Sequence, residues 1–229
     1  MNRLRFTPFA TEYDLRLAVV EAGRIAYEHG LMVANDGNIS ARLGDGEIVI
    51  TPSGFCKGRL DLEDLVVLDL DGNVLKSNPR RHLKPSSETA LHLEVYRQRP
   101  DVRGIIHAHP RIATALTISD HPLPVDMLPE VILTLGEVPV APYSTPSTHE
   151  GADAIRDLIK EHDAILMNQG GSLTVGENLD AALIALEHLE HVAEVYFYAH
   201  LLGKVNKIPA ESIAKLVQVA RKSSQPDDE

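Results

Sequence analysis

The segment Val102-Arg103-Gly104-Ile105-Ile106-His107-Ala108-His109-Pro110 is a short apolar run that ends in two histidines and a proline. In an extended strand, successive side chains point to opposite faces, so His107 and His109 share one face and Ala108 lies on the other. Two neutral imidazoles at one edge of a sheet can share a divalent ion such as zinc. The same pattern is also typical of a strand end with two partly exposed histidines, so the spacing alone leaves both interpretations open.

The composition predicts a soluble globular protein. The chain has 229 residues, of which 44% are hydrophobic and 24% are charged. This length suits a single domain, which we expect over residues 1–222, with residues 223–229 as a disordered tail. A formal net charge of -11 argues against a broad nucleic-acid surface, which needs clustered cations.

The single cysteine, Cys56, excludes an intramolecular disulfide and fits a reducing compartment. No apolar run approaches the length of a membrane span, and the first five residues lead into no signal-peptide core. We therefore expect a cytoplasmic protein with neither membrane nor nucleic acid among its partners.

One segment carries a local cluster of basic residues, although the chain as a whole has a net negative charge. It lies between residues 76 and 84 with no acid among its members, and two further cations come shortly before it. Such a patch suits a small anionic substrate, although a solvated loop would carry the same residues. The cations are Lys57, Arg59, Lys76, Arg80, Arg81 and Lys84.

Hydrophobic periodicity in the first half predicts one helix and two hairpins. Residues 12–29 have helical spacing, with Thr11 as N-cap and Gly30 as the stop. A turn-rich segment, 34–38, follows. Alternating residues and Gly-containing turns then predict hairpins, which pair 39–43 with 48–50 and 65–68 with 74–75.

The second half predicts further helices and strands around the histidine strand. Serine before glutamate predicts two helix starts, at 85–88 and, with capping-box spacing, at 147–150. Pro110 opens a helix to about residue 119, a long helix spans 178–202, and Pro209 starts the last one. Strands are expected at 131–133, 138–140, 163–167 and 173–175.

These elements predict a single α/β domain with a mixed, mostly antiparallel central sheet between helical layers. Strands in neighbouring hairpins argue against a regular doubly wound sheet.

Glycine and small polar residues stand where strands end or helices begin. Free backbone N–H groups at such junctions, together with a helix dipole, can hold an anion such as phosphate. Each segment alone is equally typical of a structural turn. The segments are Gly37-Asn38, Ser53-Gly54, Ser86-Ser87-Glu88 and Asn168-Gln169-Gly170.

Together these segments resemble the class II aldolase/adducin family, which includes the fuculose-, rhamnulose- and ribulose-phosphate aldolases and epimerases. The likeness covers nearly the whole chain, because its motifs occur in the family's order and at its spacing. The motifs are Gly37-Asn38-Ile39-Ser40, Ile50-Thr51-Pro52-Ser53-Gly54, Pro85-Ser86-Ser87-Glu88, His107-Ala108-His109-Pro110 and Asn168-Gln169-Gly170.

The resemblance implies a role for each motif. By that likeness His107 and His109 match metal ligands, and Glu88 matches the catalytic glutamate and a further ligand. The groups that hold the substrate phosphate match Gly37, Asn38, Ser53, Gly54, Ser86 and Ser87.

This sequence departs from the family pattern at two places. The family's third metal-binding histidine falls at Gln169, whose amide oxygen is a weaker zinc ligand than imidazole. The resemblance therefore implies a weakly held divalent ion, zinc or another such as manganese or cobalt. A tyrosine that a family aldolase presents from the neighbouring subunit has no counterpart in the segment 126–130.

The function implied by the resemblance is metal-dependent aldol cleavage of a small ketose phosphate, giving a dihydroxyacetone-phosphate-like ketone and an aldehyde. An epimerase or decarboxylase on the same scaffold, and a catalytically silent protein kept for binding or assembly, are the alternatives. The resemblance also implies a homotetramer with active sites at its interfaces, for which the apolar, proline-rich segment 122–142 is a credible contact surface.

The long predicted helix carries a second candidate metal site. His188 and His191 stand three residues apart, a spacing that can bind a metal. A helix face of this composition is more typically solvated. The neighbouring acids are Glu187, Glu190 and Glu194.

Overall fold

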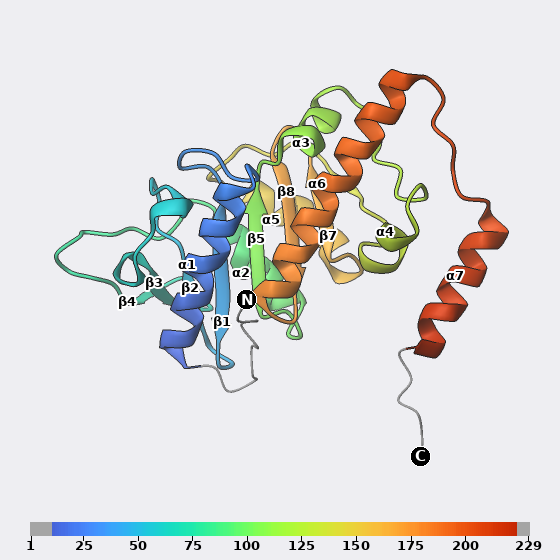
Figure 1. Ribbon diagram of the computed structural model, residues 1–229. Helices are drawn as coiled ribbons and strands as arrows, with labels where there is room; N and C mark the ends of the chain where they lie inside the picture. The colour runs from blue at the N-terminus through green and yellow to red at the C-terminus, as the bar shows by residue number, and fades with distance from the viewer. Residues whose placement is uncertain (1–10, 224–229) are drawn as a thin grey trace, which may run out of the picture.

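The computed structural model describes residues 11–223, which form one α/β domain around an eight-stranded sheet (Figure 1). The strand order is β4-β3-β2-β1-β5-β8-β7-β6, and every neighbouring pair is antiparallel except β6 and β7. The predicted mixed, mostly antiparallel sheet is thus confirmed. The strands are β1 (Asn38–Leu43), β2 (Glu47–Ile50), β3 (Val66–Asp69), β4 (Val74–Lys76), β5 (Gly104–Ala108), β6 (Val140–Ala141), β7 (Ala164–Met167) and β8 (Gly171–Gly176).

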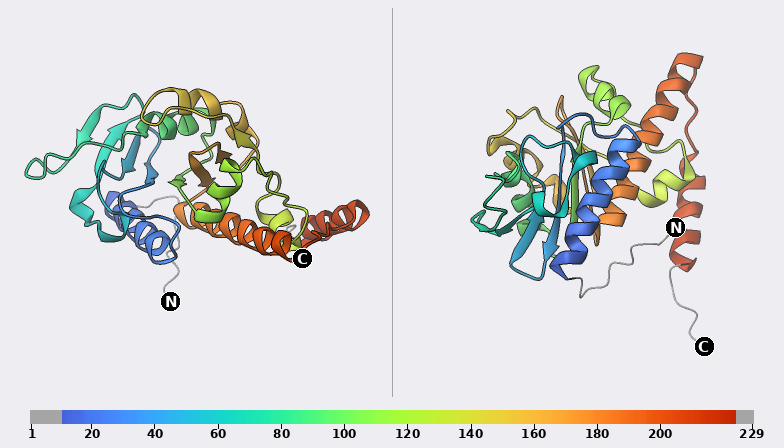
Figure 2. Two further views of the ribbon diagram at one scale, coloured as in Figure 1. Left: turned by 90° about the horizontal axis from the view of Figure 1, so that it is seen from above. Right: turned by 60° about the vertical axis from the view of Figure 1, so that its left-hand side comes forward.

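Helices cover both faces of this sheet, as Figure 2 shows from above. On one side lie α1 (Glu12–Glu28) and α6 (Leu179–Leu202), and on the other lie α2 (Thr89–Gln98) and α5 (Glu150–Ile155). Two helices, α3 (Arg111–Ile118) and α4 (Pro129–Thr134), pack beside α6, while α7 (Ala210–Ser223) lies apart from the sheet at the edge of the domain (Figure 1). Single 3-10 turns occur at Lys57–Arg59, Leu62–Asp64 and Leu158–Lys160.

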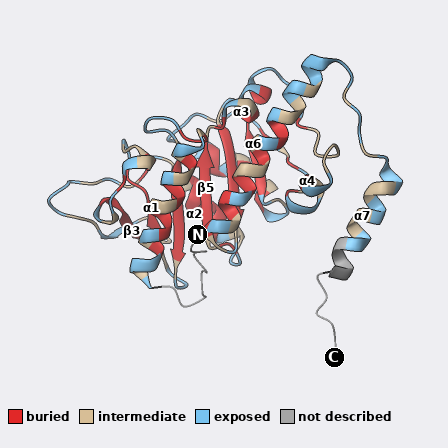
Figure 3. Ribbon diagram, viewed as in Figure 1, coloured by how far each residue is buried: buried red, intermediate tan, exposed pale blue. Residues whose placement is uncertain are grey.

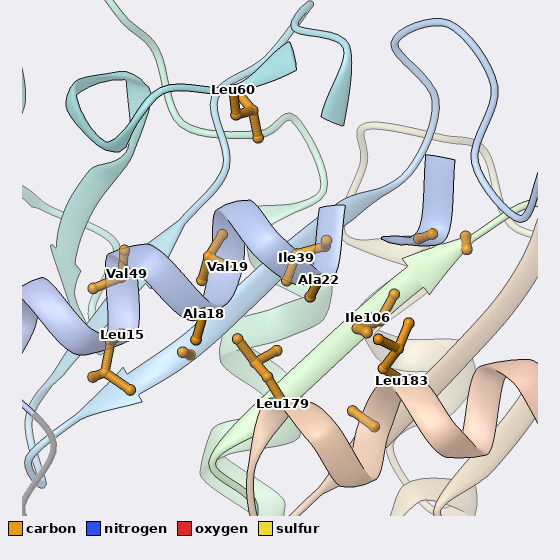
Figure 4. Close-up of a cluster of buried hydrophobic side chains, with 14 of the residues drawn as sticks. Leu15, Ala18, Val19, Ala22, Ile39, Val49, Leu60, Ile106, Leu179 and Leu183 are labelled. Atoms are coloured by element: carbon orange, nitrogen blue, oxygen red, sulfur yellow. The ribbon is translucent and has the colours of Figure 1, made fainter. Parts of the chain in front are cut away.

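The central strand β5 is buried along its whole length, and its two faces serve different cores. Ile106 packs with Ile39, Leu179 and Leu183 in the cluster between the sheet, α1 and α6 (Figure 4). Ile105 joins the cluster beneath α2 and α5. Burial of such a side chain contributes roughly 1.5–3 kcal/mol. The strand is therefore held in the core on both faces, and its burial is visible as the red centre of Figure 3.

Most predicted elements are confirmed, including both hairpins, the helix capped by Thr11 and the long helix that ends before Gly203. One strand prediction was wrong. Residues 131–133 lie in α4, because Pro129 occupies a first-turn position and Val131 turns into the core. A short apolar run cannot distinguish a buried strand from a buried helix. The strand predicted at 138–140 is β6, at Val140–Ala141.

The two serine-opened helices begin later than predicted. Glu88 is the N-cap of α2, so Ser86 and Ser87 lie in the turn before it. The capping box expected at 147–150 is absent, because the Glu150 carboxylate accepts the N–H of Thr145 instead. The predicted tail lies outside the described residues from 224 onward, whereas residue 223 ends α7.

Helix α6 approaches β5 and β8 so closely that the strands carry glycine at the contact. A Cβ on Gly104 would lie 2.6 Å from the carbonyl carbon of Asn178 and from the nitrogen of Leu179. No helix in the described part of the chain is long and apolar enough to span a membrane.

We predict that Gly104→Ala lowers the free energy of unfolding by about 1–3 kcal/mol, because the backbone of α6 must move to admit the methyl group. Urea denaturation followed by circular dichroism measures the change. Gly46→Ala is the matched control, since a Cβ there meets no atom within 4 Å. Equal stability of the two variants would contradict the proposed packing constraint.

Candidate active site

A cavity of about 260 Å³ lies at the end of the sheet where β1 begins and β5 ends. All ten site residues predicted from the sequence line this one cavity, although they come from five separate segments. They are Gly37, Asn38, Ser53, Gly54, Ser86, Ser87, Glu88, His107, His109 and Gln169.

The histidine pair is positioned by strand pairing. Asn38 on β1 stands directly opposite His107 on β5, and Leu173 on β8 flanks His107 on the other side. The Nδ1 of His107 donates to the carbonyl of Ser172 at 2.9 Å, so its Nε2 carries the lone pair. That Nε2 lies 3.3 Å from the Nε2 of His109.

Both imidazoles are held in the neutral form. Burial, together with a smaller effect of the neighbouring His109, lowers the pKa of His107 to about 3. Burial also lowers the pKa of His109, against the opposing effect of the carboxylates of Asp36 and Glu88. A metal ligand must be neutral imidazole, so the pair is ready to coordinate a cation at neutral pH.

The spacing of the pair fits a divalent ion. Two nitrogens bound tetrahedrally to zinc at 2.0–2.1 Å lie about 3.3 Å apart, which is the separation of the two Nε2 atoms. Within residues 11–223, no third histidine, cysteine or acid joins the pair in a metal-binding group. The remaining positions of such an ion would belong to oxygen atoms of Gln169, water or a substrate.

Glu88 faces the cavity but makes a different contact. Its Oε1 accepts the N–H of Ser147 at 2.6 Å, and Ser147 holds a left-handed backbone with φ of 64°. This bond ties the start of α2 to the loop before α5. The carboxylate is therefore fixed at the cavity wall and is not part of a metal-binding group with the two histidines.

The two serine-containing turns are held side by side. Pro52 and Pro85 form an isolated antiparallel bridge, in which Ser53 N–H donates to Lys84 at 3.0 Å and Ser86 N–H donates to Thr51 at 3.1 Å. Among the described residues, the backbone N–H groups of Gly54 and Ser87 donate no hydrogen bond. Free N–H groups beside the start of α2 suit an anion.

Gly37 has a structural reason to be glycine. Its φ is 74°, and a Cβ there would lie 2.7 Å from the carbonyl oxygen of His107. The residue thus lets the loop before β1 close over the end of β5. Asn38 follows it, with Oδ1 accepting a hydrogen bond from Nε2 of His92 at 2.5 Å.

Lys57 also lines the cavity, which the sequence did not indicate beyond its membership of the cationic group. It is only 3% exposed, and its Nζ donates to the carbonyls of Asn35 at 2.5 Å and Phe55 at 2.9 Å. Burial lowers the pKa of the ammonium to about 8. Lysine is rarely buried, so periodicity gives no signal for such a position.

The other cations of that group do not line the cavity. Lys76 pairs with Glu12 at 2.6 Å, and Arg81 pairs with Asp61 and Asp64. The solvated-loop interpretation therefore holds for them. Asn35, Asp36, Ser144 and Ser147 complete the polar lining and were not predicted.

The second metal site on the long helix does not form in the described part of the chain. The carboxylate of Glu190 accepts the N–H groups of Ile112 and Ala113, both at 2.9 Å, at the start of α3. Glu187 contacts Nδ1 of His29 at 2.7 Å. These acids thus tie α6 to its neighbours.

Several known proteins are similar to this chain in sequence. A family model described as Class II Aldolase and Adducin N-terminal domain matches residues 17–197. The chain is 32% identical over 213 residues to 3-oxo-tetronate 4-phosphate decarboxylase of Pectobacterium atrosepticum, covering 90% of this chain and 94% of the relative. It is 33% identical over 180 residues to L-fuculose phosphate aldolase of Haemophilus influenzae, covering 79% and 80% of the two chains.

Solved structures of related proteins have the same fold. A putative aldolase/epimerase/decarboxylase from Escherichia coli superposes with a TM-score of 0.83 at 29% identity, covering 90% of this chain and 98% of that one. An L-fuculose 1-phosphate aldolase also superposes with a TM-score of 0.83 at 29% identity, covering 94% and 100%.

Proposed function

The chain belongs to the class II aldolase and adducin family, and on that premise we propose that it is a metal-dependent lyase acting on a small sugar-derived phosphate. One observation carries the proposal. Two neutral imidazoles, two unpaired backbone N–H groups and a fixed carboxylate converge on a single cavity. The favoured reaction is decarboxylation of a 3-oxo sugar-acid phosphate, and aldol cleavage of a ketose phosphate is the second candidate.

Both reactions pass through the same species. In 3-oxo-tetronate 4-phosphate the ketone stands β to the carboxylate, so loss of carbon dioxide leaves the electron pair as the enediolate of dihydroxyacetone phosphate. Aldol cleavage of L-fuculose 1-phosphate leaves that enediolate together with an aldehyde. A site that stabilises it therefore supports either reaction.

The residues of the cavity have distinct parts in this proposal. His107 and His109 would hold the divalent ion, zinc or another such as manganese or cobalt, with an oxygen of Gln169, which lines the same cavity, as a third ligand. When bound, the ion supplies Lewis-acid polarisation of the substrate ketone. Glu88, held by Ser147, delivers the proton that the enediolate carbon takes up.

The substrate phosphate would occupy the two bridged turns. The free N–H groups of Gly54 and Ser87 donate to its oxygens, and the hydroxyls of Ser53, Ser86 and Ser87 add further donors. Asn38, which stands opposite His107, belongs to the same lining.

The chemistry of the two reactions favours decarboxylation over aldol cleavage. Aldol cleavage needs a base for the hydroxyl that becomes the aldehyde, while release of carbon dioxide needs none. The segment 126–130, which lacks a tyrosine, fits a reaction with fewer proton transfers.

We predict that the purified protein with added manganese or zinc releases carbon dioxide from 3-oxo-tetronate 4-phosphate, measured by a coupled assay alongside dihydroxyacetone phosphate. Glu88→Gln should lower turnover by about 10²–10⁴-fold with unchanged metal content. Glu161→Gln, at an exposed position remote from the cavity, is the control. Unchanged turnover in Glu88→Gln rejects its role, and cleavage of L-fuculose 1-phosphate without carbon dioxide release selects the second candidate.

We predict that Gln169→His tightens zinc by about 10–100-fold, because imidazole replaces a neutral amide beside the pair. Metal retained after dialysis, measured by mass spectrometry, should rise in this variant and fall in His107→Ala. If the wild type binds no divalent ion and His107→Ala changes nothing, the metal proposal fails.

We extend the proposal to a cytoplasmic homotetramer with segment 122–142 in its contacts. Leu133 and Val140 are exposed on this segment at 46% and 45%. Apolar side chains left in water favour association. The mass in solution, measured by light scattering, should equal four chains, and a monomer mass at working concentration would contradict this assembly.

A further inference from the structure

A chain of buried hydrogen bonds runs from helix α2 to the cavity. The hydroxyls of Tyr96 and Ser40 lie 2.8 Å apart, Ser40 Oγ lies 2.6 Å from Nδ1 of His92, and Nε2 of His92 lies 2.5 Å from Oδ1 of Asn38. His92 and Tyr96 are four residues apart on one helix face, above Asn38 and Ser40 on one strand face. All four side chains are buried, with exposures of 0% to 5%.

Only one donor-to-acceptor direction along this series of hydrogen bonds leaves no donor unpaired. Within the described residues, the hydroxyl of Tyr96 has only Ser40 Oγ as a side-chain partner. If Ser40 donated to Tyr96, the phenol hydrogen would be buried without an acceptor, which is unfavourable. Tyr96 therefore donates to Ser40, and Ser40 donates to Nδ1 of His92.

His92 must then carry its proton on Nε2. Burial lowers the pKa of His92 to about 3, so the ring is neutral, and a neutral imidazole that accepts at Nδ1 donates at Nε2. The acceptor of this hydrogen bond is the side-chain amide oxygen Oδ1 of Asn38. The orientation of the Asn38 amide is thus set by a residue that does not line the cavity.

The NH2 group of Asn38 is left for the cavity. Nδ2 donates to no other described residue, and it is not among the buried polar atoms that lack a partner. Because Asn38 lines the cavity, this group opens onto it. A flipped amide would instead present an acceptor oxygen to the substrate's own oxygens.

We infer that His92 is a positioning residue, which holds the Asn38 amide with its NH2 group in the cavity. This NH2 group would donate a hydrogen bond to a phosphate or hydroxyl oxygen of the substrate. The inference rests on the proposed function, because it assigns the atom of Asn38 that meets the sugar phosphate. It adds a specificity element that lies one residue behind the cavity wall.

Two isosteric substitutions separate positioning from packing. The amide nitrogen of glutamine falls near the place of Nε2, so His92→Gln keeps a donor for Asn38. The shorter His92→Asn reaches Ser40 but loses that donor. Binding of dihydroxyacetone phosphate in the presence of manganese, measured by calorimetry, should stay within about 3-fold of wild type for His92→Gln and weaken about 10-fold or more for His92→Asn.

Val95→Ala is the control for stability alone. Val95 is fully buried on the same helix and outside the hydrogen-bond chain, so this variant should unfold at lower urea concentration with unchanged affinity. If His92→Asn does not fold, His92→Leu tests the same point. Leucine fills a similar volume without either ring nitrogen, so Asn38 loses its donor and affinity should fall about 10-fold or more.

Equal affinities for His92→Gln and His92→Asn, with wild-type binding intact, would overturn the positioning role and leave the proposed function standing. So would a loss in Val95→Ala as large as that in His92→Asn. A wild type that binds neither dihydroxyacetone phosphate nor inorganic phosphate would overturn the proposed function, and the inference with it.

Discussion

The antiparallel pairing of β1 with β5 is the constraint on which the rest of the site depends. It sets Asn38 opposite His107, so the loop that enters β1 and the loop that leaves β5 meet at one edge of the sheet. Pairing of β5 with β8 brings the turn containing Gln169 to the same edge, and pairing of β1 with β2 brings the turn at Ser53. Side chains alternate along β5, so a slip of one residue would turn His107 toward α1 and α6. The slip would carry His107 into the apolar cluster on that face and break its buried hydrogen bond to Ser172, and this cost opposes it.

Burial then decides the charge state of this edge. The sheet and α2 enclose His92 and His107, and desolvation holds both rings neutral. Neutrality has a different consequence for each. His107 donates one N–H to Ser172, and the lone pair of its other nitrogen is available to a cation. His92 uses both nitrogens in hydrogen bonds within the protein, and its Nε2–H sets the orientation of the Asn38 amide. The same physical cause therefore underlies the proposed metal ligand at one position and the proposed positioning group at the other.

The sequence revealed much of this arrangement because its signals are local. Period two placed His107 and His109 together, and glycine or serine after an apolar run marked the turns that line the cavity. Where the fold depends on long-range burial, local patterns predicted less of it. The run at 131–133 became a helix because Pro129 and the core select that conformation, and Lys57 is buried because its ammonium meets the carbonyl of Asn35, 22 residues away, as well as that of the nearby Phe55. The bond between Glu88 and Ser147 joins positions 59 residues apart, and no periodicity reports such a contact.

The charges around the cavity also bear on the kind of substrate. The two imidazoles and Gln169 are neutral, so a divalent ion held there would keep its full charge for the substrate. Lys57 adds one positive charge in a desolvated position, while Asp36 adds one negative charge and Glu88 adds a second whenever it does not carry the proton that it delivers. With a bound divalent ion the lining would carry a net positive charge in either state, and the two bridged turns with their free N–H groups lie beside it. A 3-oxo sugar-acid phosphate brings both a phosphate and a carboxylate, whereas a ketose phosphate brings the phosphate alone. Coulomb attraction is stronger for the more highly charged substrate, and most so where water is excluded.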